Sequence, residues 1–235
     1  MSMHKIIDEV FQDTITQFNA CEGMQRFWRG EVSKRHYACY MREVFHHARE
    51  NPQIQATATA FFRGSQRDMV KPFLKHAVSE IGHDRLALND ARSAGLDVTS
   101  VPTEMPLPAT TALVAFAYFQ IYNHNPVGYL GYLYYLEHMP TAFGAEYIRQ
   151  LAQMGLGPET MTFLADHASI DVGHNAMMRE YIDHLVKDQQ ALDAVCYAVR
   201  VTGYLYGAMV TEAFADADAP SARGANPEEV RHAAR

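Results

Sequence analysis

Two histidines and an aspartate stand within ten residues of the sequence, in the segment ADHASIDVGH at 165–174. They are His167, Asp171 and His174, at successive steps of four and three residues. Residues at these spacings share one face of an α-helix. Imidazole nitrogens and carboxylate oxygens together suit iron, zinc or manganese. The segment is a candidate metal-binding helix, although a buried hydrogen-bond network or a polar surface stripe has the same pattern.

Apolar neighbours indicate that this helical face points into the protein. A helix predicted over 158–186 carries further residues on the same face, namely Met161, Leu164, Met178, Tyr181 and Leu185. A carboxylate buried among such residues has a high free energy unless a partner compensates its charge. This context disfavours the surface stripe and makes a partner necessary.

Two other segments offer side chains of the same kind. Glu80 and His83 are three residues apart in a helix predicted over 67–94, so they share a face. A Glu-x-x-His pair that projects into a helical bundle recurs in di-iron carboxylate proteins. Glu137 is the only acid in the run GYLGYLYYLEHMP, and a lone buried glutamate is rare without a partner.

The other histidines near these segments are weaker candidates. His138 lies about 100° around the helix from Glu137, so the two side chains cannot easily face one site. His76 precedes the Glu-x-x-His pair by one turn, where it either supports the ligands or belongs to an ordinary amphipathic face. His46 and His47 are candidates for the lining of a pocket.

Helical periodicity dominates the chain, and strand-like alternation is scarce. We expect one all-α domain over 1–215 and a flexible C-terminal tail over 216–235, where the chain becomes polar. Long helices with short connections favour a bundle. The predicted helices span 4–28, 33–50, 53–63, 67–94, 109–124, 127–138, 141–154, 158–186 and 188–214.

Composition restricts the class of protein. The chain has 235 residues, 48% of them hydrophobic, and a formal net charge of −7. An acidic chain is a poor general binder of nucleic acid or anionic membranes. The three cysteines do not have the spacing of a disulfide framework. The N-terminus has no signal-peptide pattern. The longest apolar run is shorter than the roughly 20 residues that span a bilayer. We expect a cytoplasmic protein without a membrane segment.

The charges of the candidate ligands favour two metal ions. Glu80, Glu137 and Asp171 supply three negative charges, while the histidines bind metal in their neutral form. Two ferrous ions leave a net charge of +1, which a substrate carboxylate or reduced oxygen can cancel. One zinc ion leaves −1 and has more ligands than its usual four. Mixed histidine and carboxylate ligation suits iron that activates oxygen.

These motifs resemble those of the heme-oxygenase-like di-iron oxidases. The signature of that superfamily is a glutamate and a histidine on one core helix, a glutamate on a later helix, and then His-x3-Asp-x2-His. The resemblance spans roughly 20–190 and includes EIGHDRLALNDARSAG and YLYYLE. Some members place the first histidine seven residues after the glutamate, where this chain has Ala87. The three-residue spacing of Glu80 and His83 is similar to that in the branch that contains the fatty-acid decarboxylase that makes terminal alkenes. All six positions are filled, by Glu80, His83, Glu137, His167, Asp171 and His174.

The resemblance implies a fold, a cofactor and a reaction. The fold is a heme-oxygenase-like bundle of about seven to nine helices. The cofactor is two Fe(II) ions, with manganese or a single iron as alternatives on isolation. O2 then oxidises a small carboxylate-bearing metabolite, a fatty acid or an amino acid, through a peroxo-di-iron(III) intermediate. An external electron donor and a homodimer are compatible with the family.

The resemblance also suggests how the ligands divide between the ions. One iron is expected to bind Glu80, His83 and His167. The other is then expected to bind the remaining three ligands. Because carboxylates can bridge two ions, the six-residue set is a firmer prediction than its division.

Other proteins of this fold provide alternative functions. A thiaminase-like enzyme needs a nucleophilic cysteine, and none lies near Glu137 in the sequence. A quinone-cofactor-type enzyme works without metal and leaves the six candidate ligands unexplained. Heme oxygenase needs an axial histidine on the first helix, where only His4 is near. A non-catalytic metal-binding or interaction protein is the alternative from another class.

Overall fold

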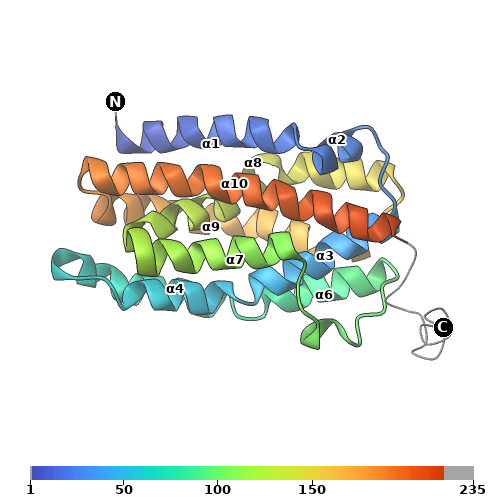
Figure 1. Ribbon diagram of the computed structural model, residues 1–235, viewed down its shortest axis with the longest axis horizontal. Helices are drawn as coiled ribbons and strands as arrows, with labels where there is room; N and C mark the ends of the chain where they lie inside the picture. The colour runs from blue at the N-terminus through green and yellow to red at the C-terminus, as the bar shows by residue number, and fades with distance from the viewer. Residues whose placement is uncertain (1, 220–235) are drawn as a thin grey trace, which may run out of the picture.

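The computed structural model describes residues 2–219, except for the side chains of 169–172. The described residues form α-helices joined by short turns, 3-10 segments and one π-helical segment, and they contain no strand (Figure 1). The all-α prediction is confirmed. The α-helices are α1 (Met3–Asn19), α2 (Glu22–Trp28), α3 (Lys34–Ala48), α4 (Asn51–Thr59), α5 (Val70–Ser79), α6 (His83–Ser93), α7 (Pro108–Phe119), α8 (Tyr129–Gln153), α9 (Thr162–Leu185) and α10 (Gln189–Asp218).

The long helix α10 is the centre of the packing. It lies along α1 and α7 in Figure 1 and also packs against α3 and α8. On the other side of the bundle, α8 packs against α9, and α6 contacts both α3 and α9. The largest fully buried side chains include Tyr129, Tyr132, Tyr135 and Tyr181, so aromatic rings fill much of the core.

Helix α8 is continuous where we expected two separate helices. The sequence predicts separate helices over 127–138 and 141–154, whereas α8 is one helix with Pro140 inside it. Proline has no amide hydrogen to donate within the helix. Nearby, the Thr141 hydroxyl donates to the His138 carbonyl at 3.1 Å. Glu137 therefore lies one turn before Pro140 on an unbroken element.

Two helices predicted as continuous are instead divided. The region 4–28 turns at Ala20 and Cys21 into α1 and α2. The region 67–94 breaks after Glu80, which is the C-cap of α5, and resumes at His83, the first residue of α6. Gly82 lies between them with φ of 105°, a left-handed conformation that glycine adopts without strain.

The predicted domain boundary is close to the end of the last helix. Helix α10 continues to Asp218, three residues beyond the expected limit of 215. Residues 220–235 lie outside the described part of the chain, so the flexible tail stays a prediction.

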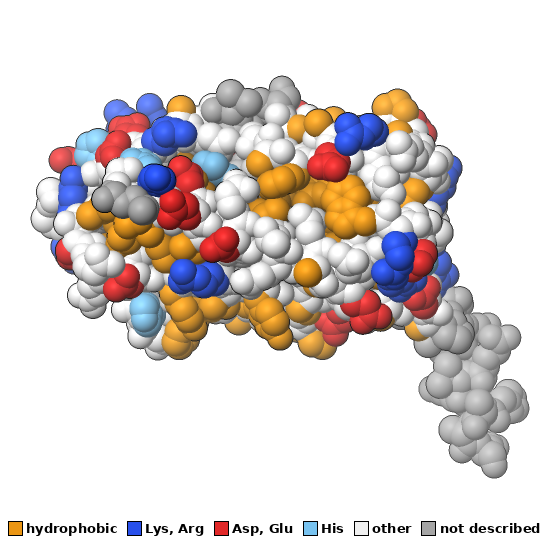
Figure 2. All heavy atoms as spheres, turned by 90° about the horizontal axis from the view of Figure 1, so that it is seen from above, with side chains coloured by type: hydrophobic (Ala, Val, Ile, Leu, Met, Phe, Trp, Pro, Cys, Tyr) orange, Lys and Arg blue, Asp and Glu red, His pale blue; other side chains and the backbone are white. Residues whose placement is uncertain are grey.

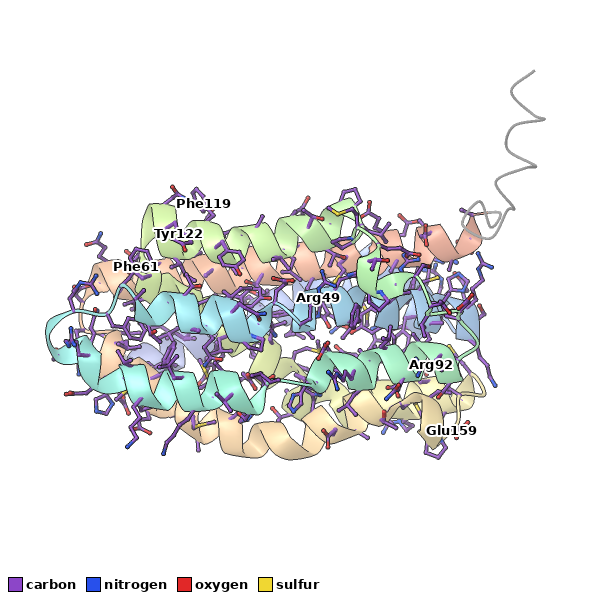
Figure 3. The ribbon with its side chains drawn as sticks, turned by 90° about the horizontal axis from the view of Figure 1, so that it is seen from below. Arg49, Phe61, Arg92, Phe119, Tyr122 and Glu159 are labelled. Carbon is purple, nitrogen blue, oxygen red and sulfur yellow. The ribbon has the colours of Figure 1, made fainter. Side chains whose placement is uncertain are left out.

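Aromatic contacts tie the segments together at one end of the bundle. Phe61, which follows α4, lies near Tyr122 of the π-helical segment η3 (Gln120–His124) in Figure 3. Their ring centroids are 5.4 Å apart in an edge-to-face contact.

The face that carries α1 mixes acidic and basic side chains with hydrophobic ones (Figure 2). Among the described residues, no helix has the length and hydrophobicity needed to cross a bilayer.

Candidate metal centre

Two overlapping groups of potential metal ligands lie inside the bundle. One contains Glu80, His83 and His167, and the other contains His76, Glu80, Glu137 and His174. Within each group, one ligand atom from every residue lies within 4.8 Å of the others. Glu80 belongs to both groups, so a single carboxylate connects them.

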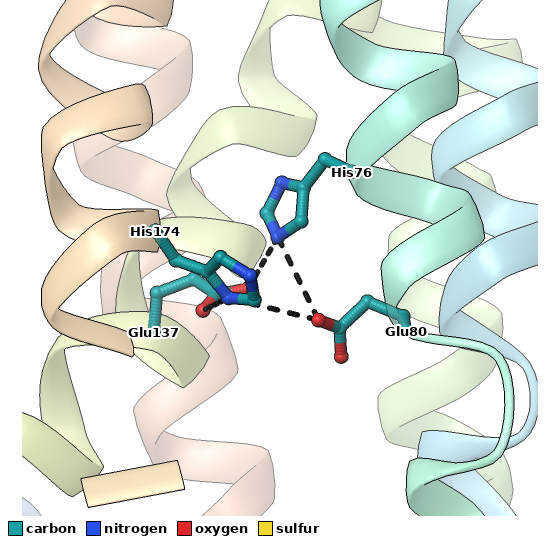
Figure 4. Close-up of side chains that lie close together, drawn as sticks. All are labelled: His76, Glu80, Glu137 and His174. Carbon is teal, nitrogen blue, oxygen red and sulfur yellow. Dashed lines mark hydrogen bonds and ion pairs between the residues drawn. The ribbon is translucent and has the colours of Figure 1, made fainter. Parts of the chain in front are cut away.

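The second group joins α5, α8 and α9 (Figure 4). Nδ1 of His174 lies 2.9 Å from Glu137 Oε2 and 3.6 Å from Glu80 Oε1. On the opposite side, Nε2 of His76 lies 3.2 Å from Glu137 Oε1 and 3.8 Å from Glu80 Oε1. Two imidazoles and two carboxylates therefore converge on one point.

The first group lies where α5 turns into α6. Nδ1 of His83 is 3.2 Å from Glu80 Oε2, and the ring of His83 packs edge-to-face on the ring of His167, with centroids 4.8 Å apart. The Glu80 carboxylate beside its ring raises the pKa of His83. Nδ1–H of His167 donates to the Phe163 carbonyl at 2.8 Å, which leaves Nε2 with a free lone pair. Metal-binding histidines are usually oriented by a bond of this kind.

The second group is almost completely removed from solvent. Glu80, Glu137 and His174 are 7%, 5% and 6% exposed, and His76 is 1% exposed. Burial opposes the ionisation of Glu137, but the hydrogen bond with His174 and the nearby ring of His76 outweigh it and lower the pKa of the carboxyl. Glu80 Oε1 is buried and makes no hydrogen bond with a described group. A divalent cation fits this cluster, because it would satisfy that oxygen and balance both carboxylates.

Five of the six ligands predicted from the sequence belong to these two groups, which together form the candidate metal cluster. They are Glu80, His83, Glu137, His167 and His174. The backbone of the sixth, Asp171, lies in α9, but its side chain is outside the described residues. The prediction that Glu80 and His83 lie on one helix is wrong, because the two residues flank the turn between α5 and α6.

His76 is the member of the cluster that sequence reasoning left undecided. Its position one turn before Glu80, in line with the buried Phe73, was the available signal. His138 points away from the cluster, as expected from its angle to Glu137. Its ring stacks on Tyr134, and its Nδ1–H donates to the Tyr134 carbonyl at 3.0 Å.

A carboxylate of α6 fixes the start of α9. Asp90 is fully buried and accepts hydrogen bonds from the Thr162 amide at 3.1 Å, the Thr162 hydroxyl at 2.5 Å and the Phe163 amide at 2.8 Å. These amides belong to the first turn of a helix, where donors have no partner within the helix. The cap holds α9 against α6 and so sets the position of His167 relative to His83.

A small cavity of about 40 Å³ lies beside the cluster. Its wall includes Glu80, Glu137 and His167, together with His47 and Asn51 from the α3–α4 junction. Burial, followed by the nearby histidines, lowers the pKa of His47 to about 3. Of the two pocket candidates in the sequence, His47 lines this cavity and His46 does not.

Comparison with known proteins identifies the family of this chain. A sequence model of the family described as iron-containing redox enzymes matches residues 38–206, a range that contains the whole cluster. The chain belongs to this family. The predicted resemblance is confirmed at the level of the family, whose description names iron.

Solved structures support the heme-oxygenase-like fold. A domain of unknown function with this fold from Shewanella denitrificans OS217 is 26% identical, with a TM-score of 0.80 over 92% of this chain and 93% of that one. A TenA homologue from P. horikoshii OT3 is 10% identical, with a TM-score of 0.73 over 92% and 99% of the two chains. A TenA homolog from Pseudomonas syringae pv. tomato str. DC3000 is 12% identical, with a TM-score of 0.75 over 91% and 93%. The two TenA structures share the fold alone. The comparison with curated proteins gives no match.

Proposed function

We propose that this iron-containing redox enzyme is an O2-dependent non-haem di-iron oxidoreductase that acts on a small carboxylate-bearing metabolite. The observation that carries the proposal is the position of Glu80, which belongs to two groups of potential ligands at once. A carboxylate shared between two groups is suited to bridge two ions. The paired glutamates and histidines on facing helices follow the arrangement of di-iron carboxylate proteins.

Each ion has a proposed set of ligands. Glu80, His83 and His167 would hold one ion. Glu137, His174 and Asp171 would hold the other, with Glu80 as a ligand shared by both. When bound, two ferrous ions would supply the electrons that activate O2. His76 lies within reach of the second ion and is proposed as an additional ligand, since its Nε2 faces both carboxylates.

The protein's own contribution is to position the ligands and exclude water. The glutamates and histidines of the second group are nearly inaccessible to solvent. Exclusion of water protects reactive species from side reactions. Asp90 and the turn at Gly82 hold the ligand-bearing helices in place, and such positioning provides a large share of a rate enhancement.

Charge balance supports a substrate with a carboxylate. Glu80, Glu137 and Asp171 carry three negative charges against four positive charges from two ferrous ions, and a neutral His76 leaves this balance unchanged. An anion therefore completes the site. Apolar residues of the adjoining cavity, which include Leu136 and Phe163, favour an apolar body on that anion.

A thiaminase-like activity has less support. The TenA structures share the fold, but no cysteine is among the described residues that line the cavity beside the cluster. A non-catalytic metal-binding protein is the second alternative. It differs from the proposal in oxygen consumption, because mere metal binding does not consume O2 in a substrate-dependent way.

Anaerobic titration with Fe(II), followed by exposure to O2, tests the proposal. We expect two irons per chain and oxygen uptake that a carboxylate substrate accelerates. Fatty acids and hydrophobic amino acids are screened, each beside its methyl ester or its primary alcohol. Binding of iron without oxygen uptake would favour the non-catalytic alternative, and equal acceleration by the neutral analogues would exclude the carboxylate as the recognised group.

A further inference from the structure

His47 and Asn51 line the cavity beside the metal cluster, and each carries hydrogen-bonding groups that no other described residue uses. His47 is 3% exposed, and neither ring nitrogen has a hydrogen-bond partner among the residues whose side chains the structure describes. It lines the cavity beside Glu80 and His167, yet it belongs to neither group of potential metal ligands. A buried polar group without a partner carries a substantial free-energy cost, so an unpaired imidazole beside a cavity points to a ligand.

The orientation of Asn51 is fixed by a tyrosine. Oδ1 of Asn51 accepts a hydrogen bond from the hydroxyl of Tyr132 at 3.0 Å. Because Oδ1 is the acceptor, the amide nitrogen is the group left for the cavity that Asn51 lines. Asn51 therefore presents N–H donors, and neutral His47 adds another. Two donor-bearing side chains on one wall match an oxygen-rich acceptor such as a carboxylate.

A second cavity continues from the first. It has a volume of about 50 Å³ and an almost entirely apolar wall, which includes Phe27 and Phe214. Met139 and Leu164 line both cavities and so stand between them. Each cavity is smaller than the roughly 150 Å³ that holds a benzene molecule. A bound molecule thus needs a side chain to move, and the unbranched methionine is the adaptable one.

We propose that His47 and Asn51 bind the carboxylate of the substrate beside the metal centre, while its apolar body displaces Met139 and enters the second cavity. This inference rests on the proposed function, because it locates the substrate of that same centre. It assigns the head group to the α3–α4 junction and the body to the space that α1, α2, α3, α8, α9 and α10 line. The position of the Met139 side chain therefore limits the length of the apolar chain that can enter the second cavity.

Binding to Mn(II)-loaded protein tests the proposal without turnover. Dissociation constants are measured by calorimetry for butyrate, octanoate and octan-1-ol. Wild type is expected to bind both acids. Asn51→Asp keeps an acceptor for Tyr132 but replaces the amide donors with a negative oxygen, so it should weaken octanoate binding about tenfold or more. His47→Leu should have an effect of similar size, and neither change should alter the binding of octan-1-ol.

Matched variants separate a subsite from a general loss of structure. His46→Leu removes a neighbouring histidine that is also buried and unpaired but lines neither cavity, and it should bind octanoate like wild type. Met139→Phe should weaken the binding of octanoate more than that of butyrate.

Metal content distinguishes the two proposals. If the His47 and Asn51 variants keep wild-type manganese but also keep wild-type octanoate affinity, the subsite is wrong and the metal centre stands. Absence of acid binding to metal-loaded wild type overturns the subsite in the same way. If wild type binds no metal, the proposed function fails and the subsite fails with it.

Discussion

Glu80 is the residue on which both groups of ligands depend. It ends α5, and its two oxygens face different histidines, with Oε2 near His83 and Oε1 between His76 and His174. Glu80→Ala should therefore reduce iron binding from two ions to fewer than one per chain. His167→Ala, which removes a member of only one group, should leave about one ion. Iron is counted by colorimetric assay after anaerobic loading and desalting.

A surface carboxylate provides the control for this experiment. Glu146 lies on α8, and its one ion pair among the described residues is with exposed Arg149, so Glu146→Ala should retain wild-type iron. If Glu80→Ala and His167→Ala retain the same iron content as each other, Glu80 does not serve both ions.

His46 gives a pH dependence that is separate from the metal cluster. Burial is the largest cause of its lowered pKa; Glu43 and Glu104 oppose this effect, whereas Arg49 and Arg42 add to it. The native protein then holds His46 neutral, while the unfolded chain protonates it below about pH 6.5. Stability is therefore fully present above that pH and is lost as the pH falls toward the lowered native pKa. The charged groups that act on His46 are Glu43, Glu104, Arg42 and Arg49.

The effect of this histidine is measured by urea unfolding of metal-free protein between pH 5 and pH 7. The free energy of unfolding of wild type should decrease on acidification. His46→Gln should make this decrease smaller, by up to about 1.4 kcal/mol per pH unit. An identical pH slope in both proteins would show that His46 does not titrate differently on folding.

At the scale of elements, the sequence predicted helix faces better than helix ends. The stripe on 158–186 placed His167 and His174 inward because apolar residues at the same spacing require burial. The break between Glu80 and His83 was missed, although Gly82 is a recognisable stop signal, because the surrounding periodicity continues across it. Glu80 and His83 are nevertheless close in the structure, because a turn also brings residues three apart together.

Close packing of α8 and α10 supplies a prediction at this scale. A Cβ added at Gly131 would overlap the Val195 carbonyl oxygen and would lie 2.8 Å from Ala198 Cβ. Gly131→Ala should therefore force the helices apart and lower the free energy of unfolding by roughly 1–3 kcal/mol. Since α8 also carries Glu137, iron affinity should fall as well. Denaturant titration and iron titration measure the two effects.

Gly207 on α10 is the matched control. A Cβ there would lie 3.4 Å from Cys21 Sγ, an ordinary contact. Gly207→Ala should leave stability unchanged or raise it by up to about 1 kcal/mol, because alanine favours helix. Equal destabilisation by both substitutions would mean that the close approach at Gly131 is not the cause.

For the whole molecule, the sequence predicted an all-helical bundle around a metal centre because both depend on regular spacing. The cavities could not be predicted in this way. Met139 of α8 and Leu164 of α9 line the same cavity, and His47 lines it from the end of α3. These contacts depend on how helices distant in sequence pack together, and no spacing along one helix encodes them.

Metal binding should stabilise the entire fold, because the ligands come from α5, α6, α8 and α9 and converge only in the native state. In the metal-free protein, Glu80 and Glu137 share one buried site, where like charges oppose each other. A ligand at 100 times its dissociation constant adds about 2.7 kcal/mol of stability. For a chain of this size that gain raises the melting temperature by roughly 5–10 °C.

Thermal melts with Fe(II) under anaerobic conditions, or with Mn(II), are compared with melts in chelator. Glu80→Ala removes the shared ligand and should abolish the shift, while Glu146→Ala should keep it. A wild-type melting temperature that is the same with saturating metal and with chelator would place the metal centre elsewhere.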